Sequence, residues 1–297
     1  MTHVTQLEKY DDSLDFRLPG SGSARDDCGN FLWIGHRTAQ TNVFHGMRIK
    51  SSCHRRECPV CYPDWAKREA LASLDRLDAY RSLFHKRIVH YVISPPQSKP
   101  YSSLSLYRSL RKGAYQAGKL RGIKGGVMIF HTRASRYDDP KRYTLLHCSD
   151  GPHFHVLGDG WLSNVKEFYL GDGWVIKNLR VRSKGSEFRT LMYILEHAAI
   201  GYPATSHSTI PDLADPQPRV NAVTWFGTMS YNKLKIEQYT GSNSIYCPIC
   251  EAEIDKNEWF VMEWIGDGDP PDKPHDVLER CGNSWIVLRP YTGWYGI

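Results

Sequence analysis

Eight cysteines, gathered mainly near the two ends of the 297-residue chain, restrict its fold more than any other feature of the sequence. Cys53, Cys58 and Cys61 are separated by four and two intervening residues. A tight turn such as Cys58-Pro-Val-Cys61 is typical of a zinc knuckle, in which two thiolates bind one ion. In an intracellular chain this grouping favours a metal over disulfides. The sequence therefore predicts structural zinc in this segment.

Three close cysteines need a fourth ligand to complete a tetrahedral zinc site. This segment has few apolar residues, so it also needs a metal to stabilise its fold. We expect residues 26–87 to form a zinc-binding segment that ends in a packing helix over about 64–87. The candidates for the fourth ligand are Cys28, as the first choice, and His36, His45 and His54 as rivals.

A second group of ligand-type residues follows in the last part of the chain. Cys247-Pro-Ile-Cys250 repeats the knuckle spacing, and His275 and Cys281 come later. This pattern is typical of a zinc-ribbon-like segment over 236–297, although the spacing of its second ligand pair is irregular. The candidate ligands are Cys247, Cys250 and Cys281, with His275 as the candidate fourth. Cys148 is expected to be a buried or loop thiol without a role.

Composition separates this chain from secreted and membrane proteins. Hydrophobic residues make up 41% and aromatic residues 12%, which is enough for a substantial core. Nothing resembles a signal peptide, and no apolar stretch is long enough to span a membrane. We expect a soluble, intracellular protein. Residues 1–25 are polar and rich in glycine and serine towards their end, which predicts a flexible leader.

A His-Phe-His triplet lies in a short apolar run that Gly151-Pro152 and Gly158 bracket. Glycine and proline at these positions indicate the ends of a strand. Because side chains alternate along a strand, His153 and His155 point to one face and Phe154 to the other. Two imidazoles at this spacing can bind one divalent cation, although a polar surface pair is the commoner use of the pattern.

Runs of apolar residues between turn signals predict strands that alternate with helices. Polar or proline-rich stretches at 132–150 and 203–218 predict loops. In chain order the predicted elements are a strand at 88–94, a helix at about 102–120, strands at 127–131, at the His triplet and at 174–181, a helix at 186–200, and a strand at 221–227. This order fits an α+β domain over 88–235, with an antiparallel sheet of about five strands flanked by helices, ferredoxin-like in outline.

The predicted helix over 186–200 has a candidate nucleophile and a candidate metal ligand on a side other than its apolar stripe. Tyr193 and His197 are four residues apart and are therefore neighbours on the helix surface. Set opposite the His triplet, they would add a nucleophile and a third metal ligand. Glu196 is a rival for the third ligand, because hard cations favour carboxylates. The ordinary alternative is a buried tyrosine that bonds to its helix neighbour.

This grouping suits the transesterification of a phosphodiester. A tyrosine hydroxyl has a pKa of about 10, so at neutral pH it is protonated and a weak nucleophile. A Mg²⁺ or Mn²⁺ ion held by the histidines would polarise the scissile phosphate and offset the charge that builds in the transition state. The products would be a 5′-phosphotyrosine link and a free 3′-hydroxyl. Because the link is covalent, the step can run backwards and rejoin the strands.

Three basic clusters, two of which also contain tyrosines, flank the His triplet in a chain of net charge +6. Cations pair with phosphates and aromatic rings stack on bases, so the clusters suit a nucleic-acid path. Any one of them alone is more typical of a solvated surface. The residues that we expect to contact DNA are Arg108, Arg111, Lys112, Arg133, Arg136, Arg180, Arg182 and Lys184.

Three stretches fall in the order of the three motifs of HUH endonucleases. They are Val89-His-Tyr-Val-Ile-Ser-Pro-Pro96, Gly151-Pro-His-Phe-His-Val-Leu157 and Met192-Tyr-Ile-Leu-Glu-His-Ala198. The first cysteine group, followed by Trp65, also resembles the leader of archaeal plasmid and virus members. The resemblance covers about residues 50–235 and implies a ferredoxin/RRM-like HUH fold. The ordered set is much more specific than the His triplet alone.

The resemblance implies a rolling-circle replication initiator in the cytoplasm of a host cell. Such a protein nicks single-stranded or hairpin origin DNA and leaves a 3′-hydroxyl primer for the host polymerase, with a host helicase as a further partner. By this resemblance His153 and His155 are ligands of a catalytic Mg²⁺ or Mn²⁺, Tyr193 is the nucleophile and His197 is the third ligand.

The chain departs from common HUH members in two respects. Glu196 stands where many carry lysine, which leaves the third ligand open. No second tyrosine lies one turn from Tyr193, so a single-tyrosine enzyme is expected, and no phosphate-binding loop predicts a fused helicase. The alternatives are an HUH transposase or relaxase, a non-catalytic zinc-ribbon DNA-binding regulator, and a zinc hydrolase that uses His153, His155 and His197.

Overall fold

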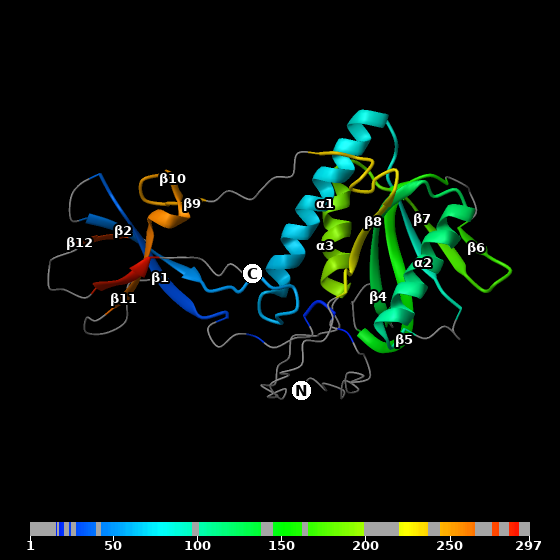
Figure 1. Cartoon of the computed structure of the whole chain (residues 1–297), viewed down its shortest axis with the longest axis horizontal. Helices are drawn as coiled ribbons and strands as arrows, with labels where there is room; N and C mark the ends of the chain where they lie inside the picture. The colour runs from blue at the N-terminus through cyan, green and yellow to red at the C-terminus, as the bar shows by residue number, and fades with distance from the viewer. Residues whose placement is uncertain are drawn as a thin grey trace.

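The computed structural model of this chain contains two antiparallel sheets, one of six strands and one of five (Figure 1). A two-stranded hairpin and three long helices complete the part of the chain that the structure describes. The α+β class and the antiparallel sheet are therefore confirmed. The described residues are 16, 18–20, 24, 28–39, 43–96, 101–137, 145–161, 166–198, 220–236, 244–264, 275–278 and 285–290.

The larger sheet has the strand order β6-β7-β3-β5-β4-β8, and every neighbouring pair in it is antiparallel. Along the chain its elements follow the predicted sequence of strands and helices, with the short β6 as an additional strand. Their bounds are β3 (Val89–Ser94), α2 (Leu104–Leu120), β4 (Gly125–Tyr137), β5 (Leu145–Asp159), β6 (Glu167–Tyr169), β7 (Val175–Val181), α3 (Ser186–Ala198) and β8 (Val223–Gly227).

Helices cover both faces of the larger sheet. Helix α2 packs on one face, where its Tyr107 contacts Phe130 of β4. Phe154 of β5 belongs to the same core. The other face carries α3 and α1 (Tyr62–Phe84), which lie side by side (Figure 1). Leu157 and Leu191 belong to the core on this second side. Because strand side chains alternate, β4, β5 and β8 contribute to both cores.

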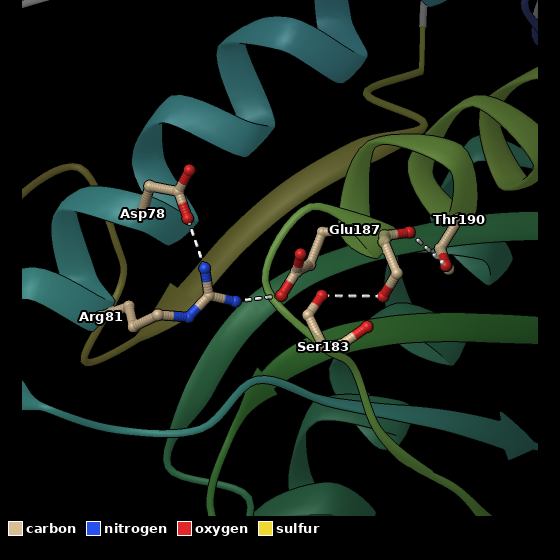
Figure 2. Close-up of polar contacts among 6 residues, drawn as sticks. Asp78, Arg81, Ser183, Glu187 and Thr190 are labelled. Atoms are coloured by element: carbon tan, nitrogen blue, oxygen red, sulfur yellow. Dashed lines mark hydrogen bonds and ion pairs between the residues drawn. The ribbon is translucent and has the colours of Figure 1, made fainter.

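An ion pair ties α1 to the start of α3 (Figure 2). Arg81, in the last turn of α1, donates to the carboxylate of the fully buried Glu187 and to Asp78 one turn back. Ser186 Oγ donates to the main-chain oxygen of Ser183 at 2.8 Å and closes the turn that leads into α3. These contacts fix α3 over the sheet. Among the described helices, none has the length and apolarity that a membrane crossing requires.

The hairpin arm of β4 and β5 is longer than the sequence predicts. Residues 132–150 were expected to be a loop, but the strands pair through Arg133–Tyr137 and Leu145–Asp150 of this range. That part of the prediction was wrong because polar composition disfavours a strand but does not prevent main-chain pairing. The side chains of Arg133–Tyr137 and Leu145–Asp150 lie outside the described residues.

Gly151-Pro152 does not end a strand, in contrast to the prediction. The pair lies inside β5 at a register shift, where two residues of β5 oppose one residue of β4. Proline lacks a main-chain N–H, and a bulge leaves that position unpaired, so the strand continues past it. The bulge directly precedes His153 and therefore governs how this histidine is presented.

Part of the expected flexible leader belongs to the core. Phe16 is 2% exposed and Leu18 is fully buried, and both pack with the side chains between α2 and the larger sheet. The ring of Phe16 lies 5.4 Å from that of Tyr107. The leader prediction was therefore wrong at these two positions, since a single apolar residue in a polar stretch carries no periodic signal.

The smaller sheet joins both ends of the chain. Its strand order is β12-β2-β1-β11-β13, so β1 pairs with β11 and β2 with β12. The sequence predicts 26–87 and 236–297 as separate zinc segments, whereas the structure pairs strands from both of them in one sheet. The bounds are β1 (Phe31–Arg37), β2 (Val43–Lys50), β9 (Ser244–Tyr246), β10 (Glu253–Asp255), η1 (Lys256–Glu258), β11 (Trp259–Trp264), β12 (His275–Leu278) and β13 (Trp285–Pro290).

Candidate functional site

Three histidines meet on the face of the larger sheet that α1 and α3 cover. His131 of β4 is paired directly with His153 of β5, and His155 follows two residues later on the same face. One ring nitrogen from each of the three lies within 4.8 Å of the others. As strand alternation predicts, Phe154 points into the opposite core. We call these residues the His131 group.

The spacing of the His131 group suits one metal ion. The Nε2 atoms of His153 and His155 lie 3.2 Å apart. Two nitrogens bound at about 2.1 Å to one ion are separated by about 3.0 Å in octahedral and about 3.4 Å in tetrahedral geometry. The donor set therefore fits a divalent cation in either geometry.

Main-chain acceptors hold the other ring nitrogen of two of these histidines. Nδ1 of His153 donates to the oxygen of Gly151 in the bulge at 2.6 Å, so its Nε2 is left as the ligand atom. Nε2 of His131 donates to the oxygen of Ile194 in α3 at 2.8 Å, which leaves Nδ1. Metal-binding histidines typically have such partners, which fix the tautomer and the ring orientation. The bulge and α3 thus orient the His131 group.

His90 of β3 and Arg182 extend the group into the protein. Nη2 of Arg182 donates to Nδ1 of His90 at 2.6 Å. Since a guanidinium only donates, Nδ1 of a neutral His90 accepts, and its Nε2 donates to Nδ1 of His155 at 2.8 Å. Burial, and then the charge of Arg182, lowers the pKa of His90 to about 3, so this histidine is neutral at pH 7. These contacts favour the His155 tautomer that carries its proton on Nε2.

Burial favours the neutral form of His153, the form that can bind a cation. Burial lowers the pKa of His153, against a smaller opposing effect of its hydrogen bond to Gly151. Neutral imidazoles are the form that ligates a metal. The buried carboxylate of Glu187 offsets part of the effect of burial on the pKa of Arg182. A chain of charged and polar groups therefore leads from Arg81 through these residues to the histidines.

Helix α3 brings the predicted nucleophile to this face of the sheet. Tyr193 directly precedes Ile194, whose carbonyl accepts the bond from His131. The side chain of Tyr193 is 47% exposed, whereas its neighbours Ile194 and Leu195 are buried in the core. The predicted apolar stripe of α3 is thus the face that packs inward, and Tyr193 lies off that stripe.

The third member of the group differs from the two that the sequence singles out. Glu196 is exposed on α3 and does not belong to the His131 group. The side chain of His197 lies outside the described residues, so its ligand role stays a prediction. His131 was missed because it ends a predicted strand without any partner in its own sequence neighbourhood. His131 follows Val127 and Ile129 at steps of two residues, so the alternation of side chains already placed it on one face with them. This alternation was the sequence signal that could have found it.

The first cysteine group assembles with Cys28 as its fourth member. Ligand atoms of Cys28, Cys53, Cys58 and Cys61 lie within 4.8 Å of one another. The sulfurs of Cys53 and Cys61 are 3.7 Å apart, too far for a disulfide and close to the separation of about 3.8 Å for two thiolates on a tetrahedral zinc ion. Cys28, and none of the three histidine rivals, completes this cluster, and the four cysteines are compatible with structural zinc.

A neighbouring arginine favours a thiolate in this cluster. Burial alone would raise the pKa of Cys53, but hydrogen bonds from the side chain and main chain of Arg55, and from nearby thiols, lower it to about 6. Nε of Arg55 donates to the sulfur of Cys53 at 3.5 Å. Zinc binds thiolates rather than thiols, so this contact prepares the cluster for a metal.

The second cysteine pair has partners other than those predicted. Cys247 and Cys250 lie with His36 of β1 and His45 of β2, and one ligand atom from each is within 4.8 Å of the others. Cys281 and the side chain of His275 lie outside the described residues. Sequence reasoning weighed His36 and His45 only for the first cluster, because the pairing of the two chain ends is not visible locally.

The predicted DNA-binding cations are spread over the domain. Arg108 and Lys112 are exposed on α2, which covers the sheet face opposite the His131 group. Arg111 is half-buried and donates to Thr224 Oγ1 at 3.3 Å. The side chains of Arg133 and Arg136 on β4 lie outside the described residues. Arg180 near the end of β7 and Lys184 in the turn before α3 are exposed, and the half-buried Arg182 between them contacts His90.

Comparison with known proteins does not assign this chain to a family: no family model, no curated protein and no solved structure matches it.

Proposed function

We propose that this protein nicks and rejoins single-stranded DNA through a covalent 5′-phosphotyrosine intermediate on Tyr193. One observation carries the proposal. The His131 group lies on the sheet face that α3 covers, and the main chain next to the exposed Tyr193 accepts a hydrogen bond from His131. Cation ligands and a candidate nucleophile therefore come from elements in direct contact.

In the proposed reaction, Oη of Tyr193 forms a bond to the scissile phosphorus as the bond to the 3′ oxygen breaks. The tyrosine proton leaves to solvent, and the departing 3′ oxygen takes up a proton, so atoms and charge balance. A divalent ion bound by the His131 group supplies charge stabilisation at the phosphate oxygens. The ester is as rich in energy as the bond that was broken, so a 3′-hydroxyl can reverse the step.

The donor set favours Mn²⁺ over Mg²⁺ for the ion. The described group contains three imidazoles and no carboxylate. Imidazole suits transition metals, whereas Mg²⁺ prefers oxygen ligands and keeps several waters. We therefore expect activity with Mn²⁺ at lower concentrations than with Mg²⁺. Zinc is assigned to the cysteine group, where thiolates are the suitable ligands.

The biological role that fits this chemistry is the initiation of rolling-circle replication in a host cytoplasm. The support is the resemblance of three ordered stretches to the HUH motifs. In this role the host polymerase extends the 3′-hydroxyl and a host helicase opens the duplex. The exposed Arg180 and Lys184, which flank in sequence the Arg182 that contacts His90, are the proposed phosphate contacts, and an HUH transposase or relaxase would use the same site.

A two-label capture assay tests the proposal. The protein is incubated with Mn²⁺ and a pool of single strands and hairpins that includes the origin of its own replicon, and the products are run on denaturing gels. A 3′ label should enter the protein band, whereas a 5′ label should appear on a shorter DNA with a free 3′-hydroxyl. Tyr193→Phe should abolish the labelled band, and Tyr169→Phe, at a tyrosine 69% exposed on β6, should keep it. Loss of the band in both variants, or in neither, would contradict the assignment.

A hydrolase is the second candidate, and the composition of the His131 group favours it. Three histidines with an open position are one of the ligand sets that hold a water on catalytic zinc. Such an enzyme would cut DNA in the Tyr193→Phe variant, and no label would enter the protein band. A non-catalytic regulator would leave the labelled DNA at full length and unattached to the protein. The same gels therefore separate all three functions.

A further inference from the structure

In addition to the first cysteine group, the chain contains a group of two histidines and two cysteines at the smaller sheet. These four residues come from segments far apart in the sequence. His36 and His45 are directly opposed on β1 and β2, so their side chains share a face. Cys247 and Cys250 come from the turn between β9 and β10. The sulfur of Cys247 lies 3.6 Å from Nδ1 of His45, and the sulfur of Cys250 lies 3.6 Å from Nε2 of His36.

These separations are those of a tetrahedral zinc site. With bonds of about 2.3 Å to sulfur and about 2.1 Å to nitrogen, the two ligand atoms of a tetrahedral ion are about 3.6 Å apart. All four ligand atoms lie within 4.8 Å of one another. Two thiolates and two imidazoles are also a ligand set typical of structural zinc.

The tautomer of His36 fits this role as well. Its Nδ1 donates to the main-chain oxygen of Arg37 at 3.1 Å, so the lone pair of Nε2 faces Cys250. The ring is held at an angle of 65° against Trp259, which is fully buried. A histidine with one nitrogen on a main-chain acceptor and a fixed ring is the usual arrangement at a metal.

We propose that His36, His45, Cys247 and Cys250 bind a second structural zinc ion that joins the two ends of the chain. The ligands in each histidine–cysteine contact are more than 200 positions apart, at 202 for His45 with Cys247 and 214 for His36 with Cys250. The ion therefore fixes the knuckle of residues 247–250 on the β1–β2 hairpin. The smaller sheet becomes a zinc-dependent unit, and this conclusion does not depend on the nicking activity.

The two zinc sites differ in how easily they lose their metal. Cys53, Cys58 and Cys61 are buried, whereas Cys250 is exposed. A hollow of about 900 Å³, lined in part by His36, His45 and Cys250, opens beside the second site. Thiol reagents should therefore reach Cys250 before they reach the buried cysteines of the first cluster.

Zinc content of the full chain tests the proposal. His36→Ala and Cys250→Ala should each contain one zinc ion fewer than the wild type by elemental analysis. Cys250→His, which keeps a ligand, should retain the wild-type content and guards against loss through misfolding. His54→Asn is the matched control, because His54 is exposed, lies in neither group and has a φ of 53° that asparagine tolerates. It should retain all of its zinc.

A wild-type experiment tests the same point without substitutions. The chain is titrated with a mercurial thiol reagent while zinc release and the modified peptides are followed. The first zinc should leave as Cys247 and Cys250 are modified. Cys281→Ala should keep the full zinc content. Loss of one zinc in Cys281→Ala, unchanged zinc in Cys250→Ala, or a first release that tracks Cys53 and Cys58 would each overturn the proposal.

Discussion

Nε2 of His131 on β4 donates a hydrogen bond of 2.8 Å to the main-chain oxygen of Ile194 on α3. This bond joins the sheet that carries the histidines to the helix that carries Tyr193. It also leaves Nδ1 of His131 for a cation. A single residue thus acts as a candidate ligand and as the link between the two halves of the proposed active site.

His131→Ala should reduce covalent DNA capture by about 100-fold or more, because it removes one of three ligands and the contact with α3. The apparent Mn²⁺ affinity should fall in parallel. Both effects can be measured by repeating the capture assay across a Mn²⁺ titration. A variant that captures DNA normally at the wild-type Mn²⁺ concentration would exclude His131 from the site.

Arg182→Met should bind Mn²⁺ about 10-fold more tightly than the wild type. The guanidinium holds His90 in the tautomer that places a proton on Nε2 of His155, the atom needed for the ion. It also adds a positive charge nearby. Without it, His90 can accept a bond from His155 and release that nitrogen. Calorimetric titration gives the affinity, and weaker binding in Arg182→Met would refute this relay. Arg182→Lys, which keeps the charge and a donor, is the matched comparison.

Stability should fall in mild acid because of His90. Its pKa is lowered from 6.5 to about 3 in the folded chain, mainly by burial, so below pH 6.5 the unfolded state binds a proton that the folded state does not. The free energy of unfolding should therefore drop by about 2 kcal/mol between pH 7 and pH 5 from this residue alone. Denaturant unfolding at the two pH values measures the drop. His90→Asn should show a smaller one, and an equal drop would assign the effect to other groups.

Removal of Arg81 should leave a costly buried charge. Its partner Glu187 is completely buried, and the pair holds the start of α3 on α1 (Figure 2). Arg81→Met should lower the free energy of unfolding by about 3 kcal/mol, and the double variant with Glu187→Gln should recover most of the loss. Denaturant unfolding of the two single variants and the double variant gives the coupling. Additive losses would show that the pair does not act as a unit.

Local periodicity was enough to predict much of the larger sheet and its helices. The predicted helices at 102–120 and 186–200 correspond to α2 and α3, because their apolar stripes repeat at helical spacing. Alternation also predicted correctly that His153 and His155 share a face opposite Phe154. These features depend only on neighbours in the chain.

Features that depend on distant contacts were not predictable in the same way. His131 joins the His131 group only through the register of β4 with β5. His36 and His45 meet Cys247 only because β1 pairs with β11 across most of the chain. No spacing rule in a single sequence encodes such a register. The continuation of β5 through its bulge and the burial of Phe16 were not predicted for the same reason.

The most direct test of the central claim is to locate the DNA on the protein. After reaction with Mn²⁺ and single-stranded DNA, nuclease treatment and proteolysis leave a nucleotide adduct that mass spectrometry can place on one residue. We predict a phosphodiester adduct on Tyr193, absent in Tyr193→Phe and strongly reduced in His131→Ala. An adduct on any other residue, or DNA cleavage without an adduct on the folded wild-type chain, would contradict the account.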